Sequence, residues 1–203
     1  MNQDSSFEKF PKTSRGRKTR EKLLRAAEYE FGERGFHAVA INDITRRAGV
    51  ALGTFYVYFE SKEEIFRSLV TYLSHRVRST LAERVADAPD RMTAEREGLQ
   101  AYIEFVREHK GLSRIISEAE FVANDAFVTH YRVFSQAYQA NLESAGKNGE
   151  IREGDQEIWS WAIMGMAIFL GLRYAEWDDS VPAEKIADTV RDLIENGLGR
   201  QGK

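Results

Sequence analysis

Apolar residues recur every three or four positions along most of the chain, and no stretch alternates apolar and polar residues as a strand would. This spacing is typical of amphipathic helices. Gly35, Gly49, Pro89 and Gly111 interrupt the pattern, as residues between helices do. The pattern therefore predicts an all-α chain of about nine helices.

The expected helices cover residues 19–33, 41–48, 51–59, 61 to beyond 81, 94–109, 112–122, 124 or 125 to the loop at 147–155, 156–177 and 182–198. Ser61 with Glu64 three residues later forms a capping-box pattern, so a helix should begin there. Asp155 is the expected cap of the eighth helix, and Pro182 should lie near the first turn of the ninth.

Residues 41–66, INDITRRAGVALGTFYVYFESKEEIF, are the most informative part of the sequence. Their spacing predicts two short helices joined at Gly49, with Phe55 and Phe59 on the inner face of the second helix. The opposite face carries hydroxyl groups that can donate to phosphate oxygens, from Thr54, Tyr56 and Tyr58. Two helices around a tight glycine turn are the geometry that inserts its second helix into the DNA major groove.

From about Thr19 to Phe66 the sequence resembles the N-terminal domain of TetR-family transcriptional regulators. The matching segments are KLLRAAEYEFGERGF and NDITRRAGVALGTFYVYFESKEEIF, with Tyr56, Tyr58, Phe59, Ser61 and Lys62 in the register of the family pattern. The family usually has Ser or Thr where this chain has Ala40 and Ala51. Two helix caps, each typically worth about 1 kcal/mol, are therefore missing, and the phosphate contacts usual at these two positions are in doubt.

The second helix supplies the expected base contacts, from Leu52, Gly53, Thr54 and Val57. Phosphate contacts are expected from Thr54, Tyr56 and Tyr58, and from Arg46 or Arg47 on the preceding helix. The resemblance adds a phosphate contact from Lys62. A basic arm with Arg15, Arg17 and Lys18 is expected to follow the adjacent minor groove.

Charge is unevenly distributed along the 203 residues, although the net charge is only −3. Residues 1–62 contain 12 Lys and Arg against 8 Asp and Glu, whereas the remaining residues contain 17 against 24. A basic first part followed by an acidic body favours DNA contact at one end of the chain.

Several other functions find no support in the sequence. There is no cysteine, and the four histidines are dispersed, so we expect no metal site and no cofactor. The chain also offers no nucleophile–base pair and no phosphate-binding glycine loop, which argues against an enzyme or a carrier. The N-terminus has no apolar core, and the apolar run from Ile158 to Leu172 is shorter than the roughly 20 residues of a membrane span. A cytoplasmic protein is expected.

The eighth expected helix is apolar on more than one face, so it should be buried on two sides. One side can pack within the chain, and the other, with the ninth helix, fits the same surface of a second chain in an isologous interface. The alternative is a helix through the centre of a monomeric body. The resemblance also implies a dimer formed by the last two helices. The expected interface residues are Trp161, Gly165, Ile168, Leu172, Ile186, Val190, Leu193 and Ile194.

Large side chains are numerous in the body, where an aromatic stripe is typical of a plain core. The resemblance instead implies an effector pocket among the fourth to eighth helices. The candidate pocket residues are Tyr72, Tyr102, Phe105, Glu118, Phe121, Phe127, Tyr131, Phe134, Tyr138, Trp159, Met164, Phe169 and Arg173. Asn141 and His130 are further polar groups within the apolar pattern. An inward-facing Arg173 would suit a fatty or aromatic acid, or its thioester.

These observations predict a flexible basic arm at 1–18, a helix-turn-helix domain at 19–62 and an effector-binding and dimerisation domain at 63–203. The expected function is that of a ligand-responsive transcriptional regulator, a repressor that an apolar or acidic effector releases from a near-palindromic operator in double-stranded DNA. The alternatives are a DNA-binding protein of the same fold without an effector, and a transcriptional activator.

Overall fold

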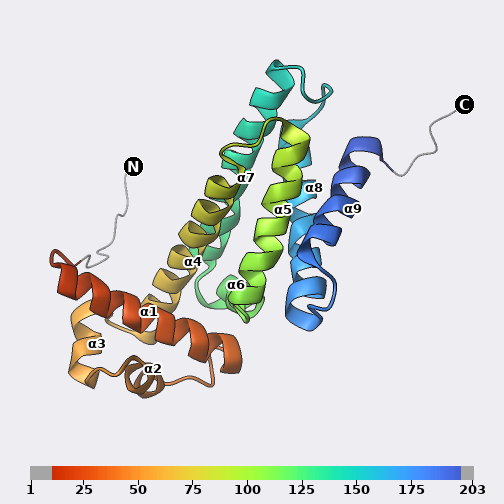
Figure 1. Ribbon diagram of the computed structural model, residues 1–203. Helices are drawn as coiled ribbons and strands as arrows, with labels where there is room; N and C mark the ends of the chain where they lie inside the picture. Colours follow the sequence, from red (N-terminus) through yellow and green to blue (C-terminus); the bar gives the residue numbers. More distant parts are fainter. Residues whose placement is uncertain (1–10, 198–203) are drawn as a thin grey trace, which may run out of the picture. The chain divides into compact units, whose positions relative to one another are not determined.

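The computed structural model describes residues 11–197, which form nine α-helices, one π-helical segment and no strand (Figure 1). The expected all-α fold is confirmed. The elements are α1 (Ser14–Arg34), α2 (Ile41–Ala48), α3 (Leu52–Tyr58), α4 (Lys62–Val85), α5 (Arg91–Glu108), α6 (Leu112–Val122), α7 (Asn124–Lys147), α8 (Gln156–Gly171), the π-helical η1 (Leu172–Trp177) and α9 (Ala183–Asn196).

Tertiary contacts divide the chain into two compact units. The first unit comprises the residues up to Tyr72 together with Arg114–Phe127, and the second comprises Leu73–Ser113 and the residues from Val128 onward. By their contacts, residues 63–72 and most of α6 thus belong to the same unit as the helix-turn-helix segment. The sequence pattern had assigned them to the second domain.

An aromatic cluster forms the core of the first unit. Phe31, Phe55, Phe59 and Phe66 are fully buried, and Phe36 is 5% exposed. The ring of Phe66 lies edge-on to those of Phe31 and Phe36, with centroids 5.1 and 5.0 Å apart. Burying each such ring stabilises the fold by about 2–3 kcal/mol, so the helices of this unit are held mainly by these side chains.

The second unit is built around α5, which packs against both α8 and α9. Its buried residues include Ile103 and Val106 of α5, Met164 of α8 and Ile186 of α9. At the surface, Arg96 of α5 pairs with two carboxylates of α9, Glu184 at 3.1 Å and Asp188 at 2.5 Å. These contacts fix the register of α9 on α5.

Side-chain caps explain where several helices begin. Thr13 accepts a hydrogen bond from the Gly16 amide (3.1 Å), so α1 begins at Ser14 and not at Thr19. Asp90 accepts from the Thr93 amide (2.8 Å), so α5 begins three residues before the predicted Ala94. Asp155 accepts from the Ile158 amide (3.0 Å), which confirms the predicted cap of α8.

The helix after Gly171 widens into π-helical geometry, which the apolar periodicity did not predict. Arg107 of α5 donates to the carbonyl oxygens of Tyr174 (2.9 Å) and Val181 (2.5 Å). Glu176 accepts from the amides of Gly111 (3.2 Å) and Ser113 (3.3 Å) at the start of α6. These bonds supply partners for backbone groups that lie outside regular helix, and they fasten η1 to both ends of the α5–α6 connection.

Candidate DNA-binding surface

A glycine turn joins α2 to α3. Gly49 has φ +67°, a left-handed conformation that other residues adopt at a cost, and its amide donates to the carbonyl oxygen of Arg46 (3.3 Å). Ile44 of α2 and Phe55 of α3 are fully buried, so each helix is anchored from beneath. The predicted helix–glycine–helix arrangement is therefore present.

The outer face of α3 is exposed and weakly polar. Leu52, Tyr56 and Val57 are 44, 50 and 61% exposed, and Gly53 is also exposed with open space where a Cβ would lie. Thr54 and Tyr58 are half-buried at the sides of this face. A short exposed helix of this kind can approach base edges closely, because Gly53 carries no side chain to hold it away.

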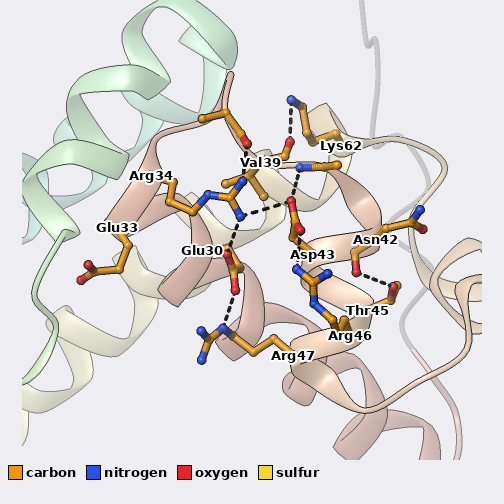
Figure 2. A network of polar contacts seen from close by, with 12 residues as sticks. Glu30, Glu33, Arg34, Val39, Asn42, Asp43, Thr45, Arg46, Arg47 and Lys62 are labelled. Atoms are coloured by element: carbon orange, nitrogen blue, oxygen red, sulfur yellow. Dashed lines mark hydrogen bonds and ion pairs between the residues drawn. The ribbon is translucent and has the colours of Figure 1, made fainter.

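A network of ion pairs ties α2 to α1 (Figure 2). The buried Glu30 accepts from Arg34 (3.1 Å) and from Nε of Arg47 (2.6 Å). Asp43 accepts from the Ala40 amide (3.0 Å) and pairs with Arg34 (3.2 Å) and Arg46 (2.6 Å). The hydrogen bond from the Ala40 amide is the main cause that lowers the pKa of Asp43, and the two arginines add to it.

The sequence pattern gave no reason to select Glu30, Arg34 or Asp43 for this site. The available signals were a carboxylate within the apolar face of α1 and its spacing of four residues from Arg34. The network shows that part of the positive charge near α3 has a structural task, since it fixes the position of α2.

The basic candidates differ in how freely they can reach a phosphate. Arg46 is exposed and its ion pair with Asp43 lies at the surface. Arg47 is bound to Glu30, and its guanidinium lies 3.4 Å from the Tyr29 ring centroid. Lys62 donates to the carbonyl oxygens of Phe36 and Val39, both at 2.9 Å. One N–H of the Lys62 ammonium group remains for a phosphate.

Residues 14–18 are helical and do not form the expected flexible arm. Arg15, Arg17 and Lys18 are exposed in the first turns of α1. Arg17 donates to the Lys12 carbonyl oxygen (3.1 Å). Residues 1–10 of the expected arm lie outside the described residues.

Neither α2 nor α3 has a side-chain cap, because Ala40 and Ala51 occupy the two cap positions. The Asp43 carboxylate partly compensates in α2 by accepting from the Ala40 amide. The Ser61 hydroxyl accepts from the Glu64 amide (3.1 Å) at the start of α4, which confirms half of the predicted capping box.

The candidate pocket residues are divided between the two units. Tyr72, Glu118, Phe121 and Phe127 belong to the first unit. Within the second unit, Phe105 and Met164 are buried, and Tyr102, Tyr131, Phe134, Tyr138 and Trp159 are half-buried. The Tyr138 hydroxyl donates to Glu95, and burial raises the pKa of Tyr138 above its ordinary value.

Four candidate pocket residues lie elsewhere. Phe121 and Phe169 are 86 and 73% exposed. Arg173 does not point inward, because it pairs with Asp178 (3.2 Å) at the end of η1. Glu118 accepts a hydrogen bond from the Phe36 amide in the first unit (2.7 Å).

The candidate dimer residues, with one exception, keep part of their surface exposed in the single chain. Trp161 is 47% exposed, and the candidates other than Ile186 are half-buried. Ile186 is the exception, because it is only 5% exposed and packs within its own chain. The segment Gln156–Trp177 is also the one described helix long and apolar enough to cross a membrane, by length and composition alone.

A helix α2 anchored by the buried Ile44, a glycine turn and an exposed outer face of α3 define a helix-turn-helix DNA-binding protein. Residues 23–69 match the family described as bacterial regulatory proteins, tetR family. YdgC, an uncharacterized HTH-type transcriptional regulator of Bacillus subtilis strain 168, is 31% identical over 186 residues, which are 89% of this chain and 93% of YdgC. The chain therefore belongs to the TetR family of transcriptional regulators.

Two further comparisons agree with this assignment. The HTH-type transcriptional repressor KstR2 of Rhodococcus jostii RHA1 is 26% identical over 191 residues, 90% of this chain and 91% of KstR2. The crystal structure of FadR from Bacillus subtilis in complex with stearoyl-CoA has the same fold, with a TM-score of 0.77 and 20% identity over 88% of this chain and 99% of FadR. The family is one of DNA-binding transcriptional regulators and not of enzymes.

Proposed function

We propose that this chain is a cytoplasmic, homodimeric repressor that binds a near-palindromic operator and is released by an acidic, largely apolar effector. The observation that carries the proposal is the exposed face of α3, with Leu52, Gly53 and Val57 above the buried Phe55. The resemblance to KstR2, a repressor, supports the direction of regulation.

In the proposed complex, α3 lies in the major groove. Leu52, Gly53, Thr54 and Val57 meet base edges, and the side chains of Leu52 and Val57 suit thymine methyl groups. Tyr56, Tyr58, Lys62 and the exposed Arg46 hold phosphates. Arg15, Arg17 and Lys18 approach the backbone from the start of α1, where they are exposed.

A second copy of the chain is the partner that best explains α8. This helix exposes Ile158, Trp161 and Phe169 to water in the single chain, although such a row of large apolar side chains is costly to leave uncovered. Gly165 has open space where a Cβ would lie, so another helix can approach closely there. Two chains would then place two α3 helices on successive major grooves.

The effector is proposed to bind the second unit, where His130 and Arg78 remain as polar groups without acidic partners. The Nδ1 atom of His130 is buried and has no hydrogen-bond partner among the described residues. Arg78 donates to the Ser74 carbonyl oxygen (3.0 Å) and pairs with no carboxylate in residues 11–197. A buried polar atom without a partner is rare, and an acidic headgroup would satisfy both residues. FadR, which has the same fold, binds an acyl thioester, stearoyl-CoA.

The test uses DNA sites enriched from a random pool by the purified protein. Operator binding is followed by fluorescence anisotropy while stearoyl-CoA, stearate or coenzyme A alone is added. We expect the acyl compounds to lower operator affinity and coenzyme A alone to have no effect. Arg78→Gln should reduce the response to stearate, whereas Arg132→Gln, at an exposed position of α7, should leave it unchanged.

Unchanged operator affinity with stearoyl-CoA, stearate and a panel of aromatic acids would contradict the effector proposal. The alternative of a DNA-binding protein without an effector would then be favoured. A reporter gene placed behind the enriched site distinguishes a repressor from an activator, since only a repressor lowers expression.

A further inference from the structure

Most of α6 belongs to the first unit, although α6 is distant in sequence from the helix-turn-helix segment. Glu118 accepts a hydrogen bond from the Phe36 amide, at 2.7 Å across 82 residues of sequence. Arg114, one turn earlier on α6, donates to the Glu33 carbonyl oxygen (2.7 Å). Both bonds end on the backbone where α1 finishes and the chain turns toward α2.

The backbone conformation of this turn, beside the Glu118 carboxylate, favours glycine. Gly35 has φ +77°, and a Cβ at this position would lie 2.6 Å from Oε1 of Glu118. The turn therefore brings its backbone directly against the carboxylate. Phe36 is buried, so without Glu118 its amide would be an unpaired buried donor, which is costly.

Lys62 holds the same turn through its carbonyl groups. Its ammonium group donates to the carbonyl oxygens of Phe36 and Val39, and it lies 4.3 Å from the Phe36 ring centroid. An anionic side chain thus binds the amide of Phe36, and a cationic side chain binds its carbonyl. The turn leads straight into α2, and α2 leads through Gly49 to α3, so its geometry sets the position of the base-reading helix.

The beginning of α6 is bound within the other unit. The amides of Gly111 and Ser113 donate to the carboxylate of Glu176 in the π-helical η1, which follows α8. The helix α6 therefore has its first amides held by η1 and its later side chains held by the α1–α2 turn. The two sets of bonds are joined by one continuous helix of 11 residues.

We propose that Glu118 is a positioning residue for operator binding, which holds the α1–α2 turn in the geometry that DNA requires and transmits movements of α6 to it. This inference rests on the proposed function, and it names the contact through which an effector would act. The carboxylate touches neither DNA nor effector, and its action is through the backbone of Gly35 and Phe36.

The experiment compares Glu118→Ala and Glu118→Gln with Glu120→Ala, a control at an exposed position of the same helix. Operator affinity, the response to stearoyl-CoA and hydrogen exchange at the Phe36 amide are measured for each protein. Glu118→Ala should lower operator affinity about tenfold, since a hydrogen bond to a charged group is lost. It should also accelerate exchange at Phe36 and reduce the fold-change caused by stearoyl-CoA.

Glu118→Gln keeps an oxygen that accepts from the Phe36 amide, so its operator affinity should lie between those of the wild type and Glu118→Ala. Glu120→Ala should match the wild type in every measurement. Thermal unfolding shows whether each variant is folded. If Glu118→Ala is unfolded, the operator affinity of Glu118→Gln tests the inference in its place.

Wild-type operator affinity and a wild-type response to stearoyl-CoA in folded Glu118→Ala would overturn this inference and leave the proposed function intact. If the wild type itself binds no DNA, the proposed function fails instead. Hydrogen exchange at Phe36 reports on the Glu118 contact in both situations, because that measurement needs no DNA.

Discussion

His130, in the second unit, has a buried polar atom that lacks, within residues 11–197, the hydrogen bond such atoms usually make. Its Nδ1 atom is enclosed without a hydrogen-bond partner among the described residues. Burial, and to a lesser degree the positive charge of Arg78, together lower the pKa of His130 to about 4. The neutral imidazole of His130 is therefore favoured in the folded protein. A ligand that contacts His130 would meet this neutral side chain.

This pKa predicts a loss of stability in mild acid. The unfolded chain binds a proton on this histidine below its ordinary pKa of about 6.5, whereas the folded chain binds it only near pH 4. The free energy of unfolding should thus fall as the pH drops from 7 to 5, by up to about 2 kcal/mol from this residue.

Urea unfolding at pH 7 and pH 5 measures the effect. His130→Leu should lose this part of the pH dependence, while His75→Leu, at an exposed position, should keep it. An equal dependence in His130→Leu and the wild type would contradict the buried, neutral state of His130.

Individual residues also mark the limit of what the sequence reveals. The exposed Leu52, Tyr56 and Val57 and the buried Phe55 followed from helical spacing alone. Glu118 and Arg173 were expected in a pocket because they interrupt an apolar pattern. Their partners, the Phe36 amide and Asp178, depend on tertiary folding, which local spacing does not encode.

The helices themselves were predictable where caps and glycines coincide with the apolar pattern. The bounds of α2 and α6 match the expected 41–48 and 112–122. The start of α1 was missed because the cap at Thr13 precedes the first apolar residues of that helix. The π-helical η1 could not be predicted, since its geometry depends on packing around Gly171 and on the bonds made by Arg107 and Glu176.

Gly171, the last residue of α8, provides a test of that packing. A Cβ at this position would lie 2.9 Å from the ring of Tyr102, whose burial raises the pKa of its hydroxyl. Gly171→Ala should therefore destabilise the protein by about 1–3 kcal/mol through overpacking. Gly98 of α5 is a matched control, because a Cβ there would meet Val85 at an ordinary 3.5 Å.

Gly98→Ala should raise the free energy of unfolding by about 0.5–1 kcal/mol, since alanine favours helix. Chemical denaturation of both variants measures the two changes. If Gly171→Ala is as stable as Gly98→Ala, the close approach of Tyr102 to α8 is wrong.

At the scale of the whole molecule, the proposed function assigns a different role to each of the two units. The first unit presents α3, and the second exposes the apolar face of α8 and contains His130. In the proposed mechanism an effector changes operator affinity only by as much as its own affinity differs between the DNA-binding and released states. In this mechanism, the proposed dimer would hold two copies of the first unit on one operator.

The proposed dimer depends on Trp161, which is exposed on α8 of the single chain. Trp161→Asp places a carboxylate in the expected apolar interface, and it should weaken dimerisation by about 100-fold or more. Sedimentation equilibrium at micromolar concentration should show a wild-type dimer and a monomeric variant. Gln136→Asp, on an exposed position of α7, should remain dimeric. A monomeric wild type would disprove the proposed interface.

The central claim is that the exposed face of α3 reads DNA in the major groove. Selection of bound sequences from a random duplex pool by the purified protein tests it most directly. We expect an inverted repeat whose half-sites are about one helical turn apart or somewhat more, with base preferences that change in Val57→Ala. No enrichment, or no binding to any duplex at low ionic strength, would contradict the account.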